Sequence, residues 1–171
     1  MNRNPVFIGT LGEISTIKKC IENNLPVYKP IIDLYGVDLI IEFNNKLNKV
    51  QVKSTSTTPT STNNPNCRIF SLTNQCITIN NNMVKSNRYL YDKNIIDYFA
   101  LYDAIDDNVY LLRNNGTKQT FTINKHRLNN QKINTNSPEK YDFDNVIKKS
   151  KLEKRDGRFV IKARSSYKNN K

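Results

Sequence analysis

The sequence is 171 residues long but has no long hydrophobic run. A helix that spans a bilayer needs about 18 or more consecutive apolar residues. The first ten residues, MNRNPVFIGT, also lack the basic and then apolar pattern of a secretion signal. We therefore expect an intracellular protein that has no membrane partner.

Cysteine and histidine are equally scarce. The three cysteines are odd in number and form no C-x-x-C pair, which argues against a disulfide framework and a structural zinc site. The single histidine, His126, has no neighbour in the sequence that would orient it as a catalytic base. Gly9 and Gly12 form a G-x-x-G pattern, but no Lys-Ser or Lys-Thr follows, so neither a P-loop nor ATP dependence is predicted.

Acidic residues are few, and basic residues outnumber them. The sequence contains 27 Lys and Arg against 15 Asp and Glu, which gives a net charge of +12 and a pI near 9.6. Residues 147–171 hold 10 basic and 2 acidic residues, and therefore +8 of that charge. This balance is typical of a nucleic-acid-binding protein; the alternative is a solvated tail that keeps a protein soluble. We expect one domain over residues 1–146 and a basic C-terminal extension over residues 147–171.

The strongest local pattern lies in residues 32–55, IDLYGVDLIIEFNNKLNKVQVKST, which predict one β-hairpin. In the first strand apolar residues alternate with others, the period of a strand with one buried face. These apolar residues are Val37, Leu39, Ile41 and Phe43. Residues 44–47 predict a four-residue turn, and the return strand alternates again, with Val50 and Val52 toward the core.

The register of this hairpin would gather polar groups on its other face. If the turn is centred within residues 44–47, Asp38 lies opposite Lys53. Directly opposed side chains have Cβ atoms about 4.5–5.5 Å apart. Gln51 lies on the same face, so a carboxylate, an amide and an ammonium group are predicted near one end of the hairpin.

The other elements are a helix before the hairpin and several strands after it. Residues 10–24 predict a helix that begins with a capping box from Thr10 to Glu13. Its predicted buried face carries Leu11, Ile14, Ile17 and Ile21. Strands are predicted at residues 26–32, 68–72, 75–79, 98–105, 108–113 and 119–124, and a second helix at residues 141–154.

The arrangement of these elements is that of an α/β or α+β fold. Residues 68–72 and 75–79 are expected to pair as a hairpin, and so are residues 98–105 and 108–113. Residues 54–66 are rich in Ser and Thr and predict a surface loop, which either lies along a ligand or is a simple linker.

The polar residues of the hairpin suit metal-assisted hydrolysis of a phosphodiester. Mg²⁺ prefers oxygen ligands, usually one or two carboxylates together with waters and substrate phosphate. Asp38 and Glu13 offer carboxylates. Gln51 offers an amide oxygen and Val52 a backbone carbonyl. Lys53 supplies a point charge that can stabilise the transition state or orient the attacking water.

Three segments of the chain carry the residues of a known family. They are G-x-x-G-E at residues 9–13, V-D-L-I-I at residues 37–41 and V-Q-V-K at residues 50–53. This pattern resembles the PD-(D/E)XK nuclease superfamily. The glutamine variant, with 25 residues from Glu13 to Asp38 and 13 from there to the glutamine, resembles the subgroup of group I intron-encoded homing endonucleases. The later stretch D-Y-F-A-L-Y resembles core strands of that subgroup.

The resemblance implies a restriction-endonuclease-like core, in which helices flank a central mixed β-sheet. It implies a homing endonuclease that uses Mg²⁺, or Mn²⁺ in its place, to make a double-strand break in DNA. From the missing signal and transmembrane segments, we expect the protein in the cytoplasm or in a DNA-containing organelle. It also implies a homo-oligomer, either a dimer or a dimer of dimers. In the roles of the family, Asp38 binds metal, Glu13 assists it and Lys53 is catalytic. Gln51 stands at a position usually held by Glu or Asp.

Each of these residues also has a purely structural explanation. Glu13 can be only the capping partner of Thr10, and Asp38 with Lys53 only a surface ion pair. Gln51 can be an ordinary polar residue on the solvent face. For the whole protein, the alternatives are a restriction enzyme or Holliday-junction resolvase of the same superfamily, and a basic nucleic-acid-binding domain without catalysis.

Overall fold

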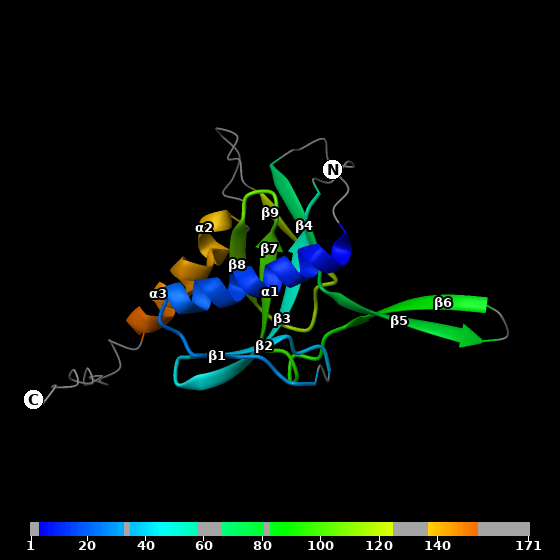
Figure 1. The fold of residues 1–171 in the computed structure, drawn as a ribbon, viewed down its shortest axis with the longest axis horizontal. Helices are drawn as coiled ribbons and strands as arrows, with labels where there is room; N and C mark the ends of the chain where they lie inside the picture. The colour runs from blue at the N-terminus through cyan, green and yellow to red at the C-terminus, as the bar shows by residue number, and fades with distance from the viewer. Residues whose placement is uncertain (1–3, 33–34, 58–65, 81–82, 125–136, 154–171) are drawn as a thin grey trace, which may run out of the picture.

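A five-stranded sheet forms the centre of the molecule, and two further strand pairs lie outside it (Figure 1). The computed structural model describes residues 4–32, 35–57, 66–80, 83–124 and 137–153. Its helices are α1 (Pro5–Glu22), α2 (Pro138–Tyr141) and α3 (Phe143–Glu153). Its strands are β1 (Val27–Tyr28), β2 (Leu39–Phe43), β3 (Lys46–Thr55), β4 (Cys67–Ser71), β5 (Thr73–Asn80), β6 (Met83–Leu90), β7 (Tyr98–Asp103), β8 (Asn108–Arg113) and β9 (Thr120–Asn124).

The central sheet is mixed, as predicted from the sequence. Its strand order is β1-β2-β3-β7-β8, in which β3 and β7 run parallel and the other neighbours antiparallel. Parallel neighbours require a crossover connection, and the chain from β4 to β6 supplies it. Strand β3 therefore lies in the middle of the sheet: its residues 46–50 pair with β2 and its residues 50–55 with β7, so β7 holds the backbone that carries Gln51 and Lys53.

The β2–β3 hairpin has a tighter turn than predicted. Asn44 and Asn45 form a two-residue turn with φ angles of 58° and 56°, and Phe43 pairs with Lys46. Two-residue hairpin turns with positive φ at both central positions match the right-handed twist of the strands. Asparagine tolerates positive φ better than most residues, so the Asn-Asn pair selects the short turn.

As a result, the predicted register of the hairpin was wrong by two residues. Leu39 pairs with Val50, so the next residue of each strand brings Asp38 beside Gln51 instead of opposite Lys53. A shift of two residues keeps every side chain on the same face of a strand, because side chains alternate with a period of two. The polar residues therefore still share one face.

Helix α1 begins earlier than predicted. Asn4 is its N-cap, and its side-chain oxygen accepts a hydrogen bond from the backbone N–H of Val6 at 3.0 Å. Pro5 follows at the first helical position, where its missing N–H removes no hydrogen bond of the helix. The capping box predicted from Thr10 to Glu13 was wrong, because both residues lie inside the helix.

The face of α1 that packs on the sheet also differs from the predicted one. The buried residues are Ile8, Gly12, Thr16 and Cys20. Of the predicted face, Ile17 is partly buried, whereas Leu11, Ile14 and Ile21 are 40%, 56% and 66% exposed. A Cβ atom at Gly12 would lie 2.2 Å from Ser54 Oγ and 3.1 Å from Val52 Cγ1. Only glycine allows the helix to come this close to β3.

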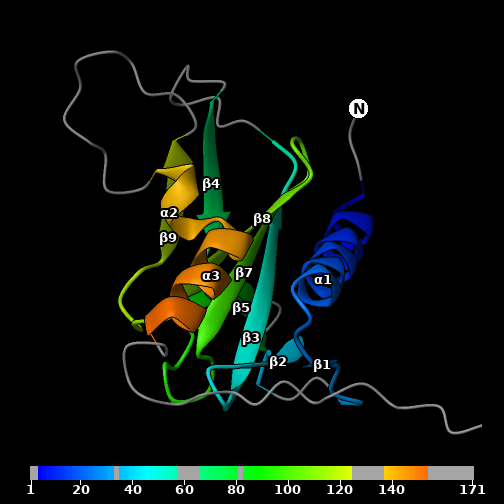
Figure 2. The same cartoon turned by 90° about the vertical axis from the view of Figure 1, so that its left-hand side faces the viewer.

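Helices cover one face of the central sheet, and a strand pair covers the other. On the first face, α1 and α3 contribute Cys20, Phe143 and Ile147 to a core shared with β2, β3, β7 and β8. On the second face, Phe70 of β4 and Phe121 of β9 join a separate core. Figure 2 shows α1 on one side of β3 and the β4–β9 pair on the other. On this second face Gln51 is therefore buried and Lys53 partly buried, whereas Lys49, nearer the turn, is exposed.

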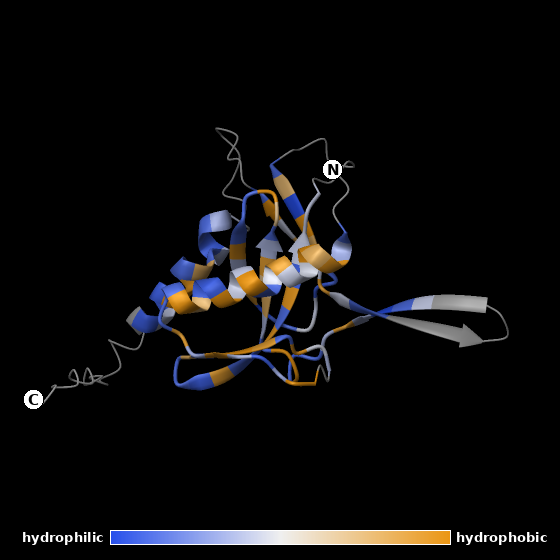
Figure 3. Cartoon of the chain, in the orientation of Figure 1, coloured by the Kyte–Doolittle hydropathy of each residue, from blue (hydrophilic) through white to orange (hydrophobic). Residues whose placement is uncertain are grey.

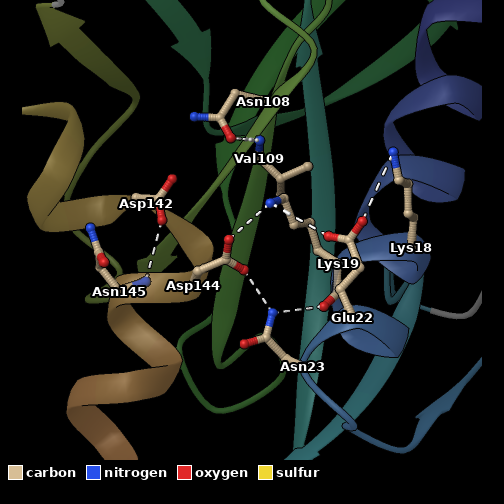
Figure 4. Close-up of polar contacts among 9 residues, drawn as sticks. All are labelled: Lys18, Lys19, Glu22, Asn23, Asn108, Val109, Asp142, Asp144 and Asn145. Carbon is tan, nitrogen blue, oxygen red and sulfur yellow. Dashed lines mark hydrogen bonds and ion pairs between the residues drawn. The ribbon is translucent and has the colours of Figure 1, made fainter.

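Helix α3, which was predicted from its amphipathic pattern, is held against α1 by a polar cluster (Figure 4). Lys19 Nζ donates to Asp144 Oδ2 at 2.9 Å, and Asn23 Nδ2 donates to Asp144 Oδ1 at 2.7 Å. Partial burial disfavours the charged carboxyl, but the two donors outweigh it and lower the pKa of Asp144. The cluster thus fixes the start of α3 beside the end of α1.

Strands β5 and β6 form a two-stranded arm that projects from the body (Figure 1). The predicted pairing of β4 with β5 was wrong, since β4 pairs with β9 and β5 with β6. Strand β6, MVKSNRYL, was not predicted at all, because its apolar residues do not alternate with polar ones. Alternation identifies a strand that has a buried face, but it does not identify its partner.

Several predicted features lie outside the described residues. They are residues 154–171 of the basic extension, residues 58–65 of the Ser- and Thr-rich loop, and His126. The domain boundary after residue 146 stays a prediction. Within the part of the chain that the structure describes, no helix combines the length and apolar character needed to cross a membrane.

Candidate active site

The polar face of the β2–β3 hairpin brings three of the predicted site residues into direct contact. Gln51 Nε2 donates to Asp38 Oδ2 and, at 3.1 Å, to the carbonyl oxygen of Val52. The backbone N–H of Val52 donates to the same Asp38 oxygen at 2.7 Å. Gln51 is only 7% exposed. A carboxylate oxygen and a backbone carbonyl therefore converge on one buried amide nitrogen.

The other end of the Gln51 amide has no hydrogen-bond partner among the described residues. Its Oε1 is buried and lies next to Gly36, where an added Cβ would be 2.7 Å from it. Gly36 has a φ of +72°, which glycine adopts without strain, and its missing side chain leaves room for the amide. A buried oxygen without a partner costs about 1–3 kcal/mol of stability. Such a group in a native structure calls for a functional explanation.

This donor set fits a divalent metal ion. A turn of the Gln51 amide by 180° exchanges its oxygen and nitrogen, and so brings Oε1 to the place where Asp38 Oδ2 and the Val52 carbonyl converge. Three oxygens around one point are the ligands that Mg²⁺ prefers, with waters and phosphate oxygens completing its shell. No group of three or more His, Cys, Asp or Glu in the described residues could hold a metal. The set here is one carboxylate, one amide and one backbone carbonyl.

Lys53 lies on the same face of β3, and residues outside the hairpin hold its ammonium group. Nζ donates to the hydroxyl oxygen of Tyr91 at 2.8 Å and to the carbonyl oxygen of Thr73 at 3.4 Å. Burial lowers the pKa of Lys53, and the negative charge of Asp38 acts in the opposite direction. The lysine is therefore partly buried, positioned by two oxygens, and within electrostatic reach of Asp38.

Glu13 stands apart from this hydrogen-bonded cluster, and its polar partner among the described residues is Lys29. Lys29 Nζ donates to Glu13 Oε2 at 2.6 Å. This hydrogen bond raises the pKa of Lys29, and the charge of Asp38 raises it further. The Lys29 ammonium is thus a cation within electrostatic reach of both predicted carboxylates.

Comparison with known proteins identifies the family of this chain. Residues 4–144 match the sequence model of the PD-(D/E)XK endonuclease family. The chain belongs to this family. The match spans Glu13, Asp38, Gln51 and Lys53, and it confirms the family predicted from the sequence. No curated protein sequence matches the chain.

A solved structure, that of a bacterial homing endonuclease, has the same fold. It superposes with a TM-score of 0.62 at 18% sequence identity, covering 89% of this chain and 99% of that one. At this identity the likeness concerns the fold alone. It confirms the predicted fold class, with a central mixed sheet and flanking helices.

As a member of the PD-(D/E)XK endonuclease family, the protein is a nuclease, and the family implies a DNA substrate and the general use of divalent metal ions. The chain departs from the family's literal Pro-Asp pair: the nearest match runs from Pro30 to Asp33, with two residues between them. Asp33 lies outside the described residues. Asp38, which the sequence favoured instead, is the aspartate that contacts Gln51 and Val52.

Two residues that contact the candidate site residues, Tyr91 and Lys29, were not predicted from the sequence. Tyr91 lies 38 residues after Lys53, beyond a strand that was not predicted, and no spacing links the two. The sequence pointed to Lys29 only indirectly, because Lys29 lies in the short strand predicted at residues 26–32. Antiparallel pairing of β1 with β2, in which Tyr28 pairs with Ile40, places the residues after β1 beside those before β2.

Proposed function

We propose that this nuclease is a Mg²⁺-dependent, site-specific DNA endonuclease of the homing type, which makes a double-strand break. The supporting observation is the convergence of Asp38 Oδ2 and the Val52 carbonyl on the buried Gln51 amide. A protein that only bound DNA would gain nothing from burying an amide oxygen without a partner, because that oxygen lowers its stability.

Each residue of the cluster has a role in this proposal. Asp38, the Val52 carbonyl and the turned Gln51 amide would hold the metal. When bound, the metal neutralises phosphate charge and lowers the pKa of its water ligand. Lys53 would place its ammonium on a phosphate oxygen, and Tyr91 positions it from 2.8 Å away. Because the lysine is partly buried, its charge is less screened than that of a surface lysine.

Glu13 would supply a second carboxylate at the edge of the site. Gly12, the residue before it, lets α1 approach β3 closely enough for this. Lys29 forms an ion pair with Glu13, with 2.6 Å between Nζ and Oε2. Because Glu13 is already paired with Lys29 and lies outside the cluster of Asp38, Gln51 and Val52, we give it an assisting role and not that of a direct metal ligand.

The arm formed by β5 and β6 and the basic extension would contact DNA. A two-stranded β-ribbon fits the major groove of B-DNA. The arm exposes Gln75, Asn87 and Arg88, whose side chains can hydrogen-bond to base edges and phosphates. Residues 147–171 would add a charge of +8 for the phosphate backbone.

A double-strand break requires more than one copy of the chain. Each chain offers one such cluster, and one active site cuts one strand. A symmetric homo-oligomer places two identical sites on the two strands of a pseudo-palindromic target. We therefore include a dimer, or a dimer of dimers, in the proposal.

The test compares Asp38→Ala and Lys53→Ala with Glu42→Ala. Glu42 is the matched control, because it is a carboxylate on the same strand face, two alternations nearer the turn. The substrates are supercoiled plasmids with random inserts, a four-way junction and single strands. We expect the first two variants to lose Mg²⁺-dependent cleavage by about 100-fold or more, as when a group that stabilises charge is removed. Binding in Ca²⁺ or EDTA should persist, and Glu42→Ala should cut normally.

Different results would support different functions. Unchanged cleavage in Asp38→Ala or Lys53→Ala would contradict the roles given to them. No cleavage of any substrate by the unaltered protein, with Mg²⁺ or Mn²⁺, would indicate a binding domain without catalysis. Cleavage of four-way junctions regardless of their sequence would indicate a junction resolvase.

A further inference from the structure

The outward face of α1 carries large apolar side chains that the fold leaves exposed. Phe7 is 69% exposed, Leu11 40%, Ile14 56% and Ile21 66%. Figure 3 shows apolar stretches recurring along this helix. Together with Lys18, these residues repeat at spacings of 4, 3, 4 and 3, which is the a/d pattern of a coiled coil. We call these five residues the α1 seam.

We propose that the α1 seam binds the α1 seam of a second copy of this chain, as an antiparallel helix pair about a two-fold axis near Ile14. This inference rests on the homo-oligomer in the proposed function and names its interface. A two-fold axis brings one surface patch onto itself, so the patch must be complementary to itself. The seam lies along a single helix and is apolar at every position except Lys18, so it meets that condition.

The size of the surface is sufficient for a specific interface. Val6, next to the seam, is a further 73% exposed. A fully exposed aromatic side chain contributes about 150–250 Å² and an aliphatic one less, so these exposed fractions give an apolar surface on the order of 500 Å² per copy. Complete burial of this surface in both copies would remove roughly 1,000 Å² from solvent, the lower bound for a specific interface. The seam contains a single charge, so it is poorly suited to phosphates.

Lys18 determines the direction of the pair. Its side chain is 68% exposed and lies 4.0 Å from Glu22. In a parallel pair it would face the partner subunit's Lys18, and like charges at such positions are unfavourable. In an antiparallel pair centred on Ile14, the two lysines are about 12 Å apart along the helix axis, at 1.5 Å per residue. Phe7 then lies beside the partner subunit's Ile21.

Cysteine cross-linking of the full-length chain, without DNA or metal, tests this geometry. Ile14→Cys should form a disulfide-linked dimer under mild oxidation, because position 14 meets itself at the axis. Lys18→Cys should not, because its two copies are separated. The natural Cys20 and Cys67 are buried, and the unaltered chain under the same oxidation gives the background. Cross-linking at position 18 but not at position 14 would overturn the antiparallel pair.

Sedimentation of the full-length chain tests the surface itself. The unaltered protein should be a dimer or larger, and Ile14→Asp should weaken association by roughly 100-fold or more, as expected when the centre of an interface is changed in both copies. Ile31→Asp is the matched control, because Ile31 is 102% exposed and lies outside the seam. A monomeric unaltered protein, or an Ile14→Asp variant that still associates, would overturn the proposal.

Failure of this interface and failure of the proposed nuclease are separable. Association is measured without DNA, so a protein that dimerises but cuts nothing contradicts only the proposed function. A protein that cuts both strands as a monomer contradicts only the interface. If both hold, Ile14→Asp should still nick plasmids, since the Asp38 cluster is intact, but its yield of double-strand breaks should fall.

Discussion

The two faces of helix α1 are built in opposite ways. The inner face consists mainly of small residues: Ile8, Gly12, Thr16 and Cys20. The outer face carries the large apolar residues Phe7, Leu11, Ile14 and Ile21. An amphipathic helix normally turns its apolar stripe to the core. Here the close approach at Gly12 leaves room only for small side chains. The comparison teaches that side-chain size does not identify the core face of a helix that lies against a sheet.

The largest expected effect comes from a substitution that disrupts the packing of the inner face of α1 and leaves its outer face intact. Ile8→Ala removes a side chain that is 4% exposed and should lower the free energy of unfolding by about 3 kcal/mol, as for other buried isoleucines. Phe7→Ala removes a larger side chain that is 69% exposed and should change it by less than about 0.5 kcal/mol. Urea denaturation in an Ile14→Asp background, where association is removed, measures both. If Phe7→Ala lowered the free energy of unfolding by more than Ile8→Ala, the assignment of the inner and outer faces of α1 would be wrong.

A pair of glycines on α1 gives the next effect. Gly12→Ala places Cβ 2.2 Å from Ser54 Oγ and should destabilise the fold by about 1–2 kcal/mol, since overpacking outweighs the gain in helix propensity. Gly9→Ala is the control: a Cβ there meets nothing within 4 Å, so it should stabilise the helix by about 0.5–1 kcal/mol. Thermal unfolding of both variants checks the opposite signs. Equal signs would mean that α1 does not approach β3 at Gly12.

The smallest effect concerns the polar end of the inner face. Asp144→Asn weakens the bond from Lys19, and should lower the free energy of unfolding by about 1 kcal/mol at neutral pH for this partly exposed pair. The pKa of Asp144 is lowered in the folded state. Its contribution is therefore present above the unfolded value of about 3.9 and is lost as pH falls through the folded value. Urea denaturation from pH 7 to pH 3 should show the two proteins converging only in acid. A difference independent of pH would contradict this.

Patterns within one strand predicted the centre of the site well. The alternation around Asp38 and Gln51 depends on local periodicity, and it survived a register error because that error was an even number of residues. The turn itself was decided by the left-handed preference of Asn44 and Asn45. The sequence carried this signal, but the predicted turn was four residues long instead of two.

Features that depend on contacts between distant segments could not be predicted in this way. The pairing of β4 with β9 brings together segments far apart in the sequence, in a core that holds both Phe70 and Phe121, and alternation carries no information about partners. Tyr91 follows residues 86–90 of β6, which are all exposed, so neither this strand nor the contact of Tyr91 with Lys53 had a pattern in the sequence. The inverted face of α1 depends on Gly12 meeting Ser54, a contact between segments 42 residues apart.

The base of the β5–β6 arm is also hydrogen-bonded to the candidate site. Thr73 is the first residue of β5, and Tyr91 directly follows the last residue of β6. Both hold the Lys53 ammonium, at 3.4 Å and 2.8 Å. The two ends of the arm therefore meet at the lysine of the candidate site. In the proposed function, the segment that would read a sequence and the charge that would act on a phosphate are therefore linked by two direct hydrogen bonds.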